Sequence, residues 1–141
     1  MQETSIEKLY EAFLKCNQKI CTDTRKLDKG SIFFCLKGAN FNANEFALKA
    51  LEGGCSYVVV DEEKYVVNEN IFFVKDVLKA LQLLANHHRK QLSLKVLAIT
   101  GSNGKTTNKE LINAVLGKQF KTLATVGNLN NHIGVPLTLL S

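Results

Sequence analysis

The sequence predicts an α/β protein, in which helices alternate with short strands that pair in a parallel sheet. Two observations carry this prediction: apolar residues recur at helical spacing in several segments, and short β-branched or aromatic runs lie between these segments. A third is a glycine-containing loop between an apolar run and a helical pattern, which is the setting of a phosphate-binding loop.

The first part of the chain contains a complete alternation of helices and strands. Three helices are expected at amphipathic segments, over residues 5–15, 44–51 and 77–91. Three strands are expected at short apolar runs, over residues 32–36, 57–60 and 71–74. Thr4 and Glu7 have the form of a capping box, and Asp76 is suited to cap the third helix.

The pattern restarts after residue 93. A strand is expected over residues 96–100, a loop over 101–105, a helix over 106–118 and a strand over 122–126. Pro136 suits the first position of a further helix. Two strands and one helix cannot bury both faces of a parallel sheet, so the sequence is expected to be the N-terminal part of a longer protein. We therefore predict two domains, residues 1–93 and a truncated 94–141.

Composition narrows the class of protein. The 141 residues are 45% hydrophobic and 22% charged, which is typical of a globular domain. The net charge of +5 comes from scattered lysines rather than a basic run, so no nucleic-acid partner is expected. No run approaches the ~18 apolar residues of a membrane span, and the N-terminus lacks the pattern of a secretory signal.

The four cysteines are Cys16, Cys21, Cys35 and Cys55, and no two of them have the C-x-x-C spacing. A zinc site or a disulfide framework is therefore not expected. Reduced, structural cysteines fit a protein of the cytoplasm.

The glycine-containing loop carries the chemistry. Gly101 and Gly104 allow backbone amides to approach an anion, and the following helix adds unpaired N–H groups. Lys105 would contact the β- and γ-phosphates of a nucleoside triphosphate, most simply ATP, and the Thr106 hydroxyl would be a Mg²⁺ ligand. The expected nucleotide-binding residues are Gly101, Ser102, Asn103, Gly104, Lys105, Thr106 and Thr107.

One position departs from the general pattern G-x-x-x-x-G-K-[ST], because Ile99 stands where the first glycine would be. The alternative interpretation is a glycine-rich turn with a surface lysine. The apolar run before the loop and the helical pattern after it favour phosphate binding.

The loop Thr-Gly-Ser-Asn-Gly-Lys-Thr-Thr at residues 100–107 resembles that of the Mur ligases and their folylpolyglutamate synthetase relatives. A second run, Gly-Asn-Leu-Asn-Asn-His-Ile-Gly-Val-Pro-Leu-Thr-Leu-Leu at residues 127–140, resembles the Mur ligases that add D-alanyl-D-alanine. Residues 23–25, 30–34 and 36–38 resemble their N-terminal, UDP-binding domain.

This resemblance implies a small α/β UDP-substrate domain followed by the start of a P-loop ATPase domain with a parallel sheet. It implies ATP-dependent amide formation between UDP-N-acetylmuramoyl-tripeptide and D-alanyl-D-alanine in peptidoglycan precursor synthesis, with Lys105 and Thr106 catalytic. Substrate contacts are implied for Thr24, Arg25, Asn128, Asn130 and Asn131. The 141 residues alone are expected to be inactive.

Several alternatives stay open. Residues 22–25 could be a polar turn with a helix cap, and the three asparagines could be turn formers only. The chain could belong to the ligase that adds the third peptide residue, or be a nucleotide-binding or nucleic-acid-binding module without chemistry. The loop at Asn42, Ala43 and Asn44 departs from the family, whose members commonly place an acidic or glycine residue and a histidine there, so its function is open.

Overall fold

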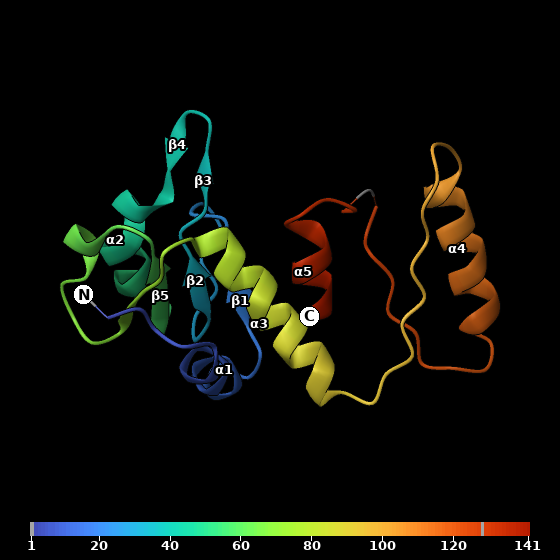
Figure 1. Cartoon of the computed structure of the whole chain (residues 1–141), viewed down its shortest axis with the longest axis horizontal. Helices are drawn as coiled ribbons and strands as arrows, with labels where there is room; N and C mark the ends of the chain where they lie inside the picture. Colours follow the sequence, from blue (N-terminus) through green and yellow to red (C-terminus); the bar gives the residue numbers. More distant parts are fainter. Residues whose placement is uncertain (1, 128) are drawn as a thin grey trace.

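The computed structural model describes residues 2–127 and 129–141, and its main body is an α/β sandwich around one parallel sheet (Figure 1). The sheet has four strands in the order β1-β2-β5-β6, and every neighbouring pair is parallel. The strands are β1 (Ile20–Cys21), β2 (Ile32–Phe34), β5 (Tyr57–Val60) and β6 (Ile71–Phe73). This confirms the α/β fold class.

Both faces of the sheet are covered, as a parallel sheet requires. Successive side chains of a strand point to opposite faces, so Ile32 and Phe34 join one core cluster and Phe33 joins the other. The first cluster lies under α1 (Ile6–Lys15) and α3 (Val77–Gln91), and the second lies under α2 (Ala47–Glu52).

The three predicted helices of this body are present, with two changes: the second begins as an α-helix only at Ala47, after a 3₁₀ turn, and the cap of the first differs. Ser5 rather than Thr4 is the N-cap of α1, and its hydroxyl accepts from the Lys8 N–H at 3.3 Å. Thr4 is displaced from that position because its own N–H donates to the Phe73 carbonyl at 2.7 Å, which ties the N-terminus to β6. Asp76 caps α3 as predicted, with its carboxylate accepting from the Lys79 N–H at 2.8 Å.

The segment between β2 and α2 contains structure that the sequence patterns did not predict. A hairpin of β3 (Lys37–Gly38) and β4 (Phe41–Asn42) leads into a 3₁₀ turn, η1 (Ala43–Phe46), which runs directly into α2. A second short 3₁₀ turn, η2 (Glu63–Tyr65), follows β5. The hairpin projects from the body in Figure 1.

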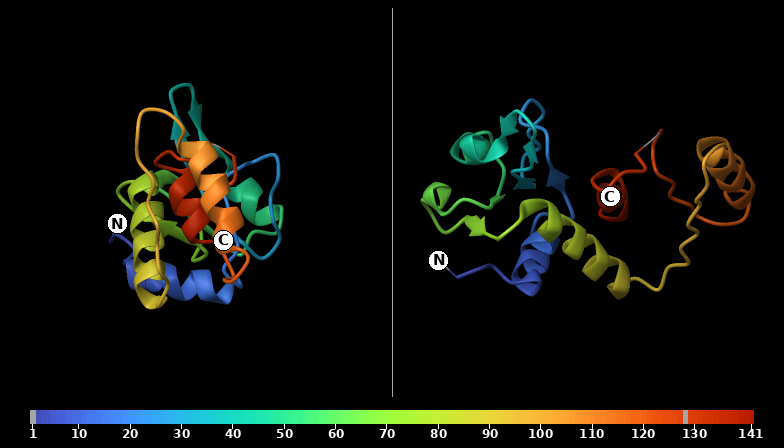
Figure 2. Two further views of the ribbon diagram at one scale, coloured as in Figure 1. Left: turned by 90° about the vertical axis from the view of Figure 1, so that its right-hand side faces the viewer. Right: turned by 45° about the horizontal axis from the view of Figure 1, so that its top comes forward.

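The strands predicted over 96–100 and 122–126 are wrong. Among the described residues no ladder forms there, and Val96, Leu97, Leu123 and Val126 are all exposed. A parallel pair is stable only when both of its faces are covered, and nothing in the described part of the chain covers these two segments. The helix between them does form, as α4 (Lys105–Leu116), and it stands apart from the sheet (Figures 1 and 2).

The last helix, α5 (Gly134–Leu139), returns to the main body and packs on α3. Pro136 is the third residue of this helix rather than the first. Leu140, at its C-terminal cap, is buried in the first core cluster, and the Gln82 amide donates to the His132 carbonyl at 3.0 Å.

The four cysteines are buried as free thiols, and burial raises the pKa of the Cys35 thiol far above its usual range. None of the helices in the described part of the chain combines the length and the apolar character that a bilayer crossing requires.

Candidate nucleotide and substrate sites

The phosphate-loop candidate is a glycine-capped helix start. Gly104 is the N-cap of α4 at φ 76°, a left-handed conformation that disfavours any side chain. The first helical bond runs from the Asn108 N–H to the Gly104 carbonyl at 2.9 Å, so the N–H groups of the preceding three residues have no acceptor within the helix. Such a helix start favours a bound anion through these N–H groups and the helix dipole.

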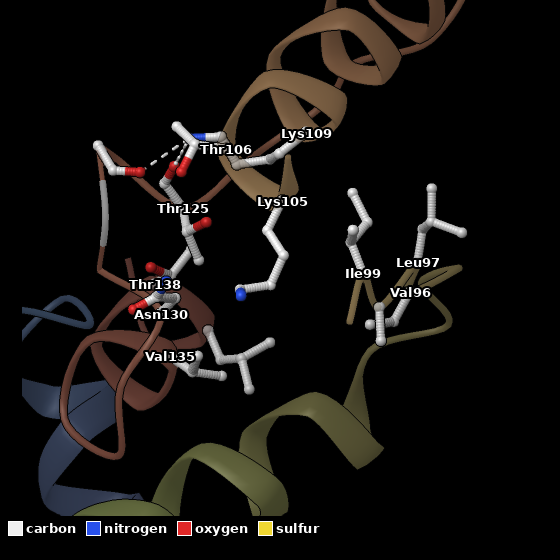
Figure 3. A pocket seen from close by; sticks show the side chains of 13 residues that line it. Val96, Leu97, Ile99, Lys105, Thr106, Lys109, Thr125, Asn130, Val135 and Thr138 are labelled. Atoms are coloured by element: carbon white, nitrogen blue, oxygen red, sulfur yellow. Dashed lines mark hydrogen bonds between the residues drawn. The ribbon is translucent and has the colours of Figure 1, made fainter. Parts of the chain in front are cut away.

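Lys105 begins this helix and turns back over its own loop. Its ammonium donates to the Gly101 carbonyl at 2.5 Å, and Gly101 has φ 143°, which again favours glycine. In Figure 3 the Lys105 side chain points into the space between the 96–99 segment and α5. The lysine is therefore held over the loop, where it could exchange the carbonyl for a phosphate oxygen.

A pocket of about 310 Å³ surrounds this lysine. Residues 96–99, the first turns of α4 and α5 line it, together with Thr125, Gly127 and Asn130. Thr106 and Asn130 are among its lining residues, whereas Ser102, Asn103 and Thr107 are exposed outside it. The structure thus brings the loop lysine and one asparagine of the second specific run to the same pocket (Figure 3).

Lys109 also lines this pocket, and the sequence analysis missed it. Its ammonium donates to the carbonyls of Thr125 at 2.5 Å and Gly127 at 3.1 Å, and it pairs with Glu110 at 2.7 Å. These contacts fasten the 125–127 segment to α4. One turn separates Lys109 from Lys105 on the helix, and this i, i+4 spacing was the sequence feature that could have indicated a shared face.

The asparagines of the second run have different surroundings. The Asn131 carboxamide oxygen accepts from the N–H groups of Ile133 at 3.1 Å and Gly134 at 2.7 Å, so this residue forms the turn that starts α5. Asn130 is exposed toward the pocket. Asn128 lies outside the described residues.

Thr24 and Arg25 lie in a separate open pocket of about 460 Å³, lined by residues 22–25 and Phe41. The Arg25 guanidinium makes a two-bond contact with the Asp23 carboxylate, from Nε at 2.9 Å and NH2 at 2.8 Å. The Arg25 backbone N–H also donates to this carboxylate at 2.9 Å. This bond closes a polar turn, and no helix starts here for Asp23 to cap. The hydrogen bonds from Arg25 hold the pKa of Asp23 well below its usual range.

The Arg25 side chain is 85% exposed, so its guanidinium stays reachable by an anion despite this pairing. The pocket at Arg25 and the pocket at Lys105 share no lining residue. The chain therefore presents two separate polar sites, one on the sheet-containing body and one at the start of α4.

Comparison with known proteins identifies the family to which this chain is similar. The Mur ligase middle domain matches residues 99–141, the part that holds the phosphate-loop candidate. The UDP-N-acetylmuramoyl-tripeptide–D-alanyl-D-alanine ligase of Bacillus subtilis is 45% identical over 124 residues, which are 86% of this chain and 27% of that protein. The Escherichia coli enzyme of the same name is 45% identical over 121 residues, 86% of this chain and 26% of that protein.

Solved structures of the same family are also similar to this chain. MurF from Acinetobacter baumannii is similar with a TM-score of 0.79 and 40% identity, covering 86% of this chain and 27% of that one. MurF from Thermotoga maritima in complex with ADP is similar with a TM-score of 0.81 and 29% identity, covering 89% of this chain and 29% of that one. The chain spans about 27% of the length of its curated relatives, and by these matches it belongs to the Mur ligase family.

Proposed function

We propose that this chain provides the UDP-substrate domain and the ATP-binding loop of a ligase that joins D-alanyl-D-alanine to UDP-N-acetylmuramoyl-tripeptide. The proposal takes residues 1–93 as the first unit and 94–141 as the beginning of the second. The observation that carries it is the shared pocket of Lys105, on the phosphate loop, and Asn130, on the run that resembles the D-alanyl-D-alanine-adding ligases. The names of the relatives support the choice of reaction.

In the proposed reaction the terminal carboxylate of the tripeptide attacks the γ-phosphorus of ATP, giving an acyl phosphate and ADP. The amine of D-alanyl-D-alanine then displaces phosphate and forms the amide. Two anions must meet in the first step, so positive charge at the transferring phosphoryl group lowers the barrier. Lys105 and the N–H groups at the start of α4 would supply that charge.

Mg²⁺ fits the same loop as a proposed cofactor. The Thr106 hydroxyl lies in the first turn of α4 and would be its protein ligand. No group of three or more His, Cys, Asp or Glu side chains gathers anywhere in the described residues, so phosphate oxygens and water would complete the coordination. When bound, the ion supplies further positive charge to the phosphate oxygens.

Thr24 and Arg25 would contact the UDP portion, with the exposed guanidinium against a phosphate. Because UDP-linked precursors and ATP are cytoplasmic metabolites, we place the protein in the cytoplasm. The chain covers 27% of relatives whose names describe the whole reaction, so we expect the 141 residues to bind nucleotides without forming the amide.

Titration calorimetry of the 141-residue chain with MgATP tests the loop. Lys105→Ala should weaken binding at least ~10-fold, the scale of losing one charge-assisted contact. Lys118→Ala, at an exposed lysine near the other end of α4, is the matched control and should leave the affinity unchanged. Equal MgATP affinity in the wild-type chain and Lys105→Ala would refute the assignment.

A further inference from the structure

The β3–β4 hairpin presents an aromatic side chain at the Arg25 pocket. Phe41 is 48% exposed and lines that pocket together with residues 22–25. Its ring stacks on Phe46 with centroids 5.5 Å apart and planes 28° apart, and the Lys49 ammonium lies 5.9 Å from the centre of the Phe46 ring. Phe46 thus supports one side of the Phe41 ring while the Phe41 side chain stays partly open to solvent.

Phe41 lines a second open space as well. Residues of the hairpin, η1 and Glu62 border this open space of about 600 Å³. Phe41 therefore borders both spaces, and the position of the hairpin affects the width of the Arg25 pocket.

The hairpin has only two residues in each strand, and a short two-stranded hairpin is marginal in water on its own. Its position depends on contacts to the body, and Asn44 makes the central ones. Asn44 is 0% exposed; its carboxamide nitrogen donates to Asn42 Oδ1 at 2.8 Å and to Asp61 Oδ1 at 2.8 Å. Its oxygen accepts from the Asp61 N–H at 3.1 Å.

Charged groups complete this network. Lys37, on β3, pairs with Asp61 at 2.7 Å and with Glu62 at 3.1 Å. The Asn42 carboxamide nitrogen donates to Glu62 Oε1 at 2.8 Å. Hydrogen bonds from Lys64, Lys37 and Asn42 lower the pKa of Glu62 to about 2, so it is ionised at neutral pH. Both strands of the hairpin are thereby tied to the loop that follows β5.

We propose that Phe41 is the surface on which the base of the nucleoside diphosphate stacks in the Arg25 pocket, and that Asn42 and Asn44 are positioning residues that hold the hairpin at this spacing. This inference rests on the proposed function, because it takes UDP as the ligand of that pocket. A base on Phe41 would leave the diphosphate within the pocket that Arg25 also lines. It also gives the Asn42-Ala43-Asn44 loop a function: the two amides hold the hairpin in position and need not touch the ligand.

Calorimetry of the 141-residue chain with UDP tests the stacking. Phe41→Ala should weaken UDP binding about 10-fold, the scale of losing one base–aromatic stack. Phe41→Tyr keeps a ring and should stay near the wild-type affinity. Phe120→Ala removes another exposed phenylalanine, which lies outside the pocket, so it should leave the UDP affinity unchanged.

The claim that Asn42 positions the hairpin is tested by combining its substitution with that of Phe41. Asn42→Ala should weaken UDP binding several-fold when Phe41 is present and have little further effect in Phe41→Ala, because the amide acts through the ring. A purely structural change would instead add its full effect in both backgrounds. Asn44→Ala removes both bonds that tie this buried side chain to Asp61, whereas Asn42→Ala keeps them. Asn42→Ala is therefore the decisive variant, and its urea midpoint is measured beside the wild type to show that the chain stays folded.

The outcomes are separable. If the wild-type chain binds UDP and Phe41→Ala binds it equally well, the stacking surface is wrong while the proposed function stands. If Asn42→Ala and Phe41→Ala weaken binding additively, the positioning claim is wrong. If the wild-type chain binds no UDP at millimolar concentration, the UDP-substrate half of the proposed function falls, and this inference falls with it.

Discussion

At the scale of single residues, the phosphate loop owes its shape to two glycines and its contacts to two lysines. Gly101 and Gly104 adopt positive φ, and Lys105 and Lys109 lie one turn apart on the helix that follows. The two lysines differ in their contacts. The Lys105 ammonium donates to the Gly101 carbonyl of its own loop and can turn to a ligand, whereas the Lys109 ammonium is held between two carbonyls and a carboxylate.

Lys109→Met should release the 125–127 segment from α4. The variant keeps the stem of the side chain but leaves the carbonyls of Thr125 and Gly127 without their donor, at a cost of about 1–3 kcal/mol. Limited proteolysis within residues 122–127 should become several-fold faster because the released segment is more easily cut, and MgATP affinity should fall several-fold. Lys118→Met is the control. An unchanged rate of cleavage in the 122–127 segment would show that Lys109 does not hold it.

Asn130 and Asn131 should separate in their effects. Asn131→Ala removes the acceptor of two backbone N–H groups at the start of α5, so stability should drop by about 1 kcal/mol, and Asn131→Asp should restore it. Asn130→Ala should leave the urea midpoint unchanged and weaken binding of the nucleotide at the Lys105 pocket. Urea unfolding followed by circular dichroism, with MgATP titration of each variant, distinguishes the two; identical behaviour of both variants would contradict this division.

At the scale of elements, the sequence predicts what local patterns encode. The third helix and the strand Tyr57–Val60 were predicted because an Asp cap, a helical apolar period and a β-branched run are all local features. β1 was missed because two residues carry too short a pattern, and the β3–β4 hairpin was missed for the same reason. The runs at 96–100 and 122–126 have strand composition, but a strand exists only when a partner pairs with it.

The site residues also divide into those that local sequence predicts and those that only the folded chain brings together. The glycine loop and Lys105 could be predicted because the motif is contiguous in sequence. The contacts of Lys109 join residues 16 and 18 positions apart, and those of Asn44 reach residue 61, so neither can be predicted from spacing. Phe41 and residues 22–25 meet only in the folded body.

The return of α5 to α3 gives an element-scale prediction. Leu140 is 2% exposed within the first core cluster, so Leu140→Ala should destabilise the chain by about 2–5 kcal/mol through lost burial and a remaining cavity. Val135→Ala, on an exposed position of α5, is the control and should cost far less. Urea unfolding measures both. Equal costs for the two variants would mean that α5 is not packed on α3 in solution.

At the scale of the whole molecule, the core belongs almost entirely to the sheet-containing body. Every buried hydrophobic residue comes from this body, with the addition of Leu140, while α4 buries none in the described chain. Large apolar side chains are exposed on α4 and on the segments before and after it, among them Leu97, Val115, Phe120 and Val126. Most of the stability of a helix in a protein comes from tertiary packing, and α4 lacks this packing.

We therefore expect hydrogen exchange to separate α4 from the sheet-containing body, on which α5 is packed. Amides of α3 and β5 should be protected close to the global free energy of unfolding, and amides of α4 should exchange by local opening within seconds to minutes.

MgATP should slow exchange in the first turns of α4 and leave α3 unchanged, because the ligand binds at the Lys105 pocket. Lys105→Ala should remove this slowing. UDP should instead slow exchange in residues 22–25 and the β3–β4 hairpin and leave α4 unchanged. If α4 is as protected as α3 without nucleotide, α4 and the sheet-containing body are one cooperative unit, and the proposed domain boundary near residue 93 is wrong.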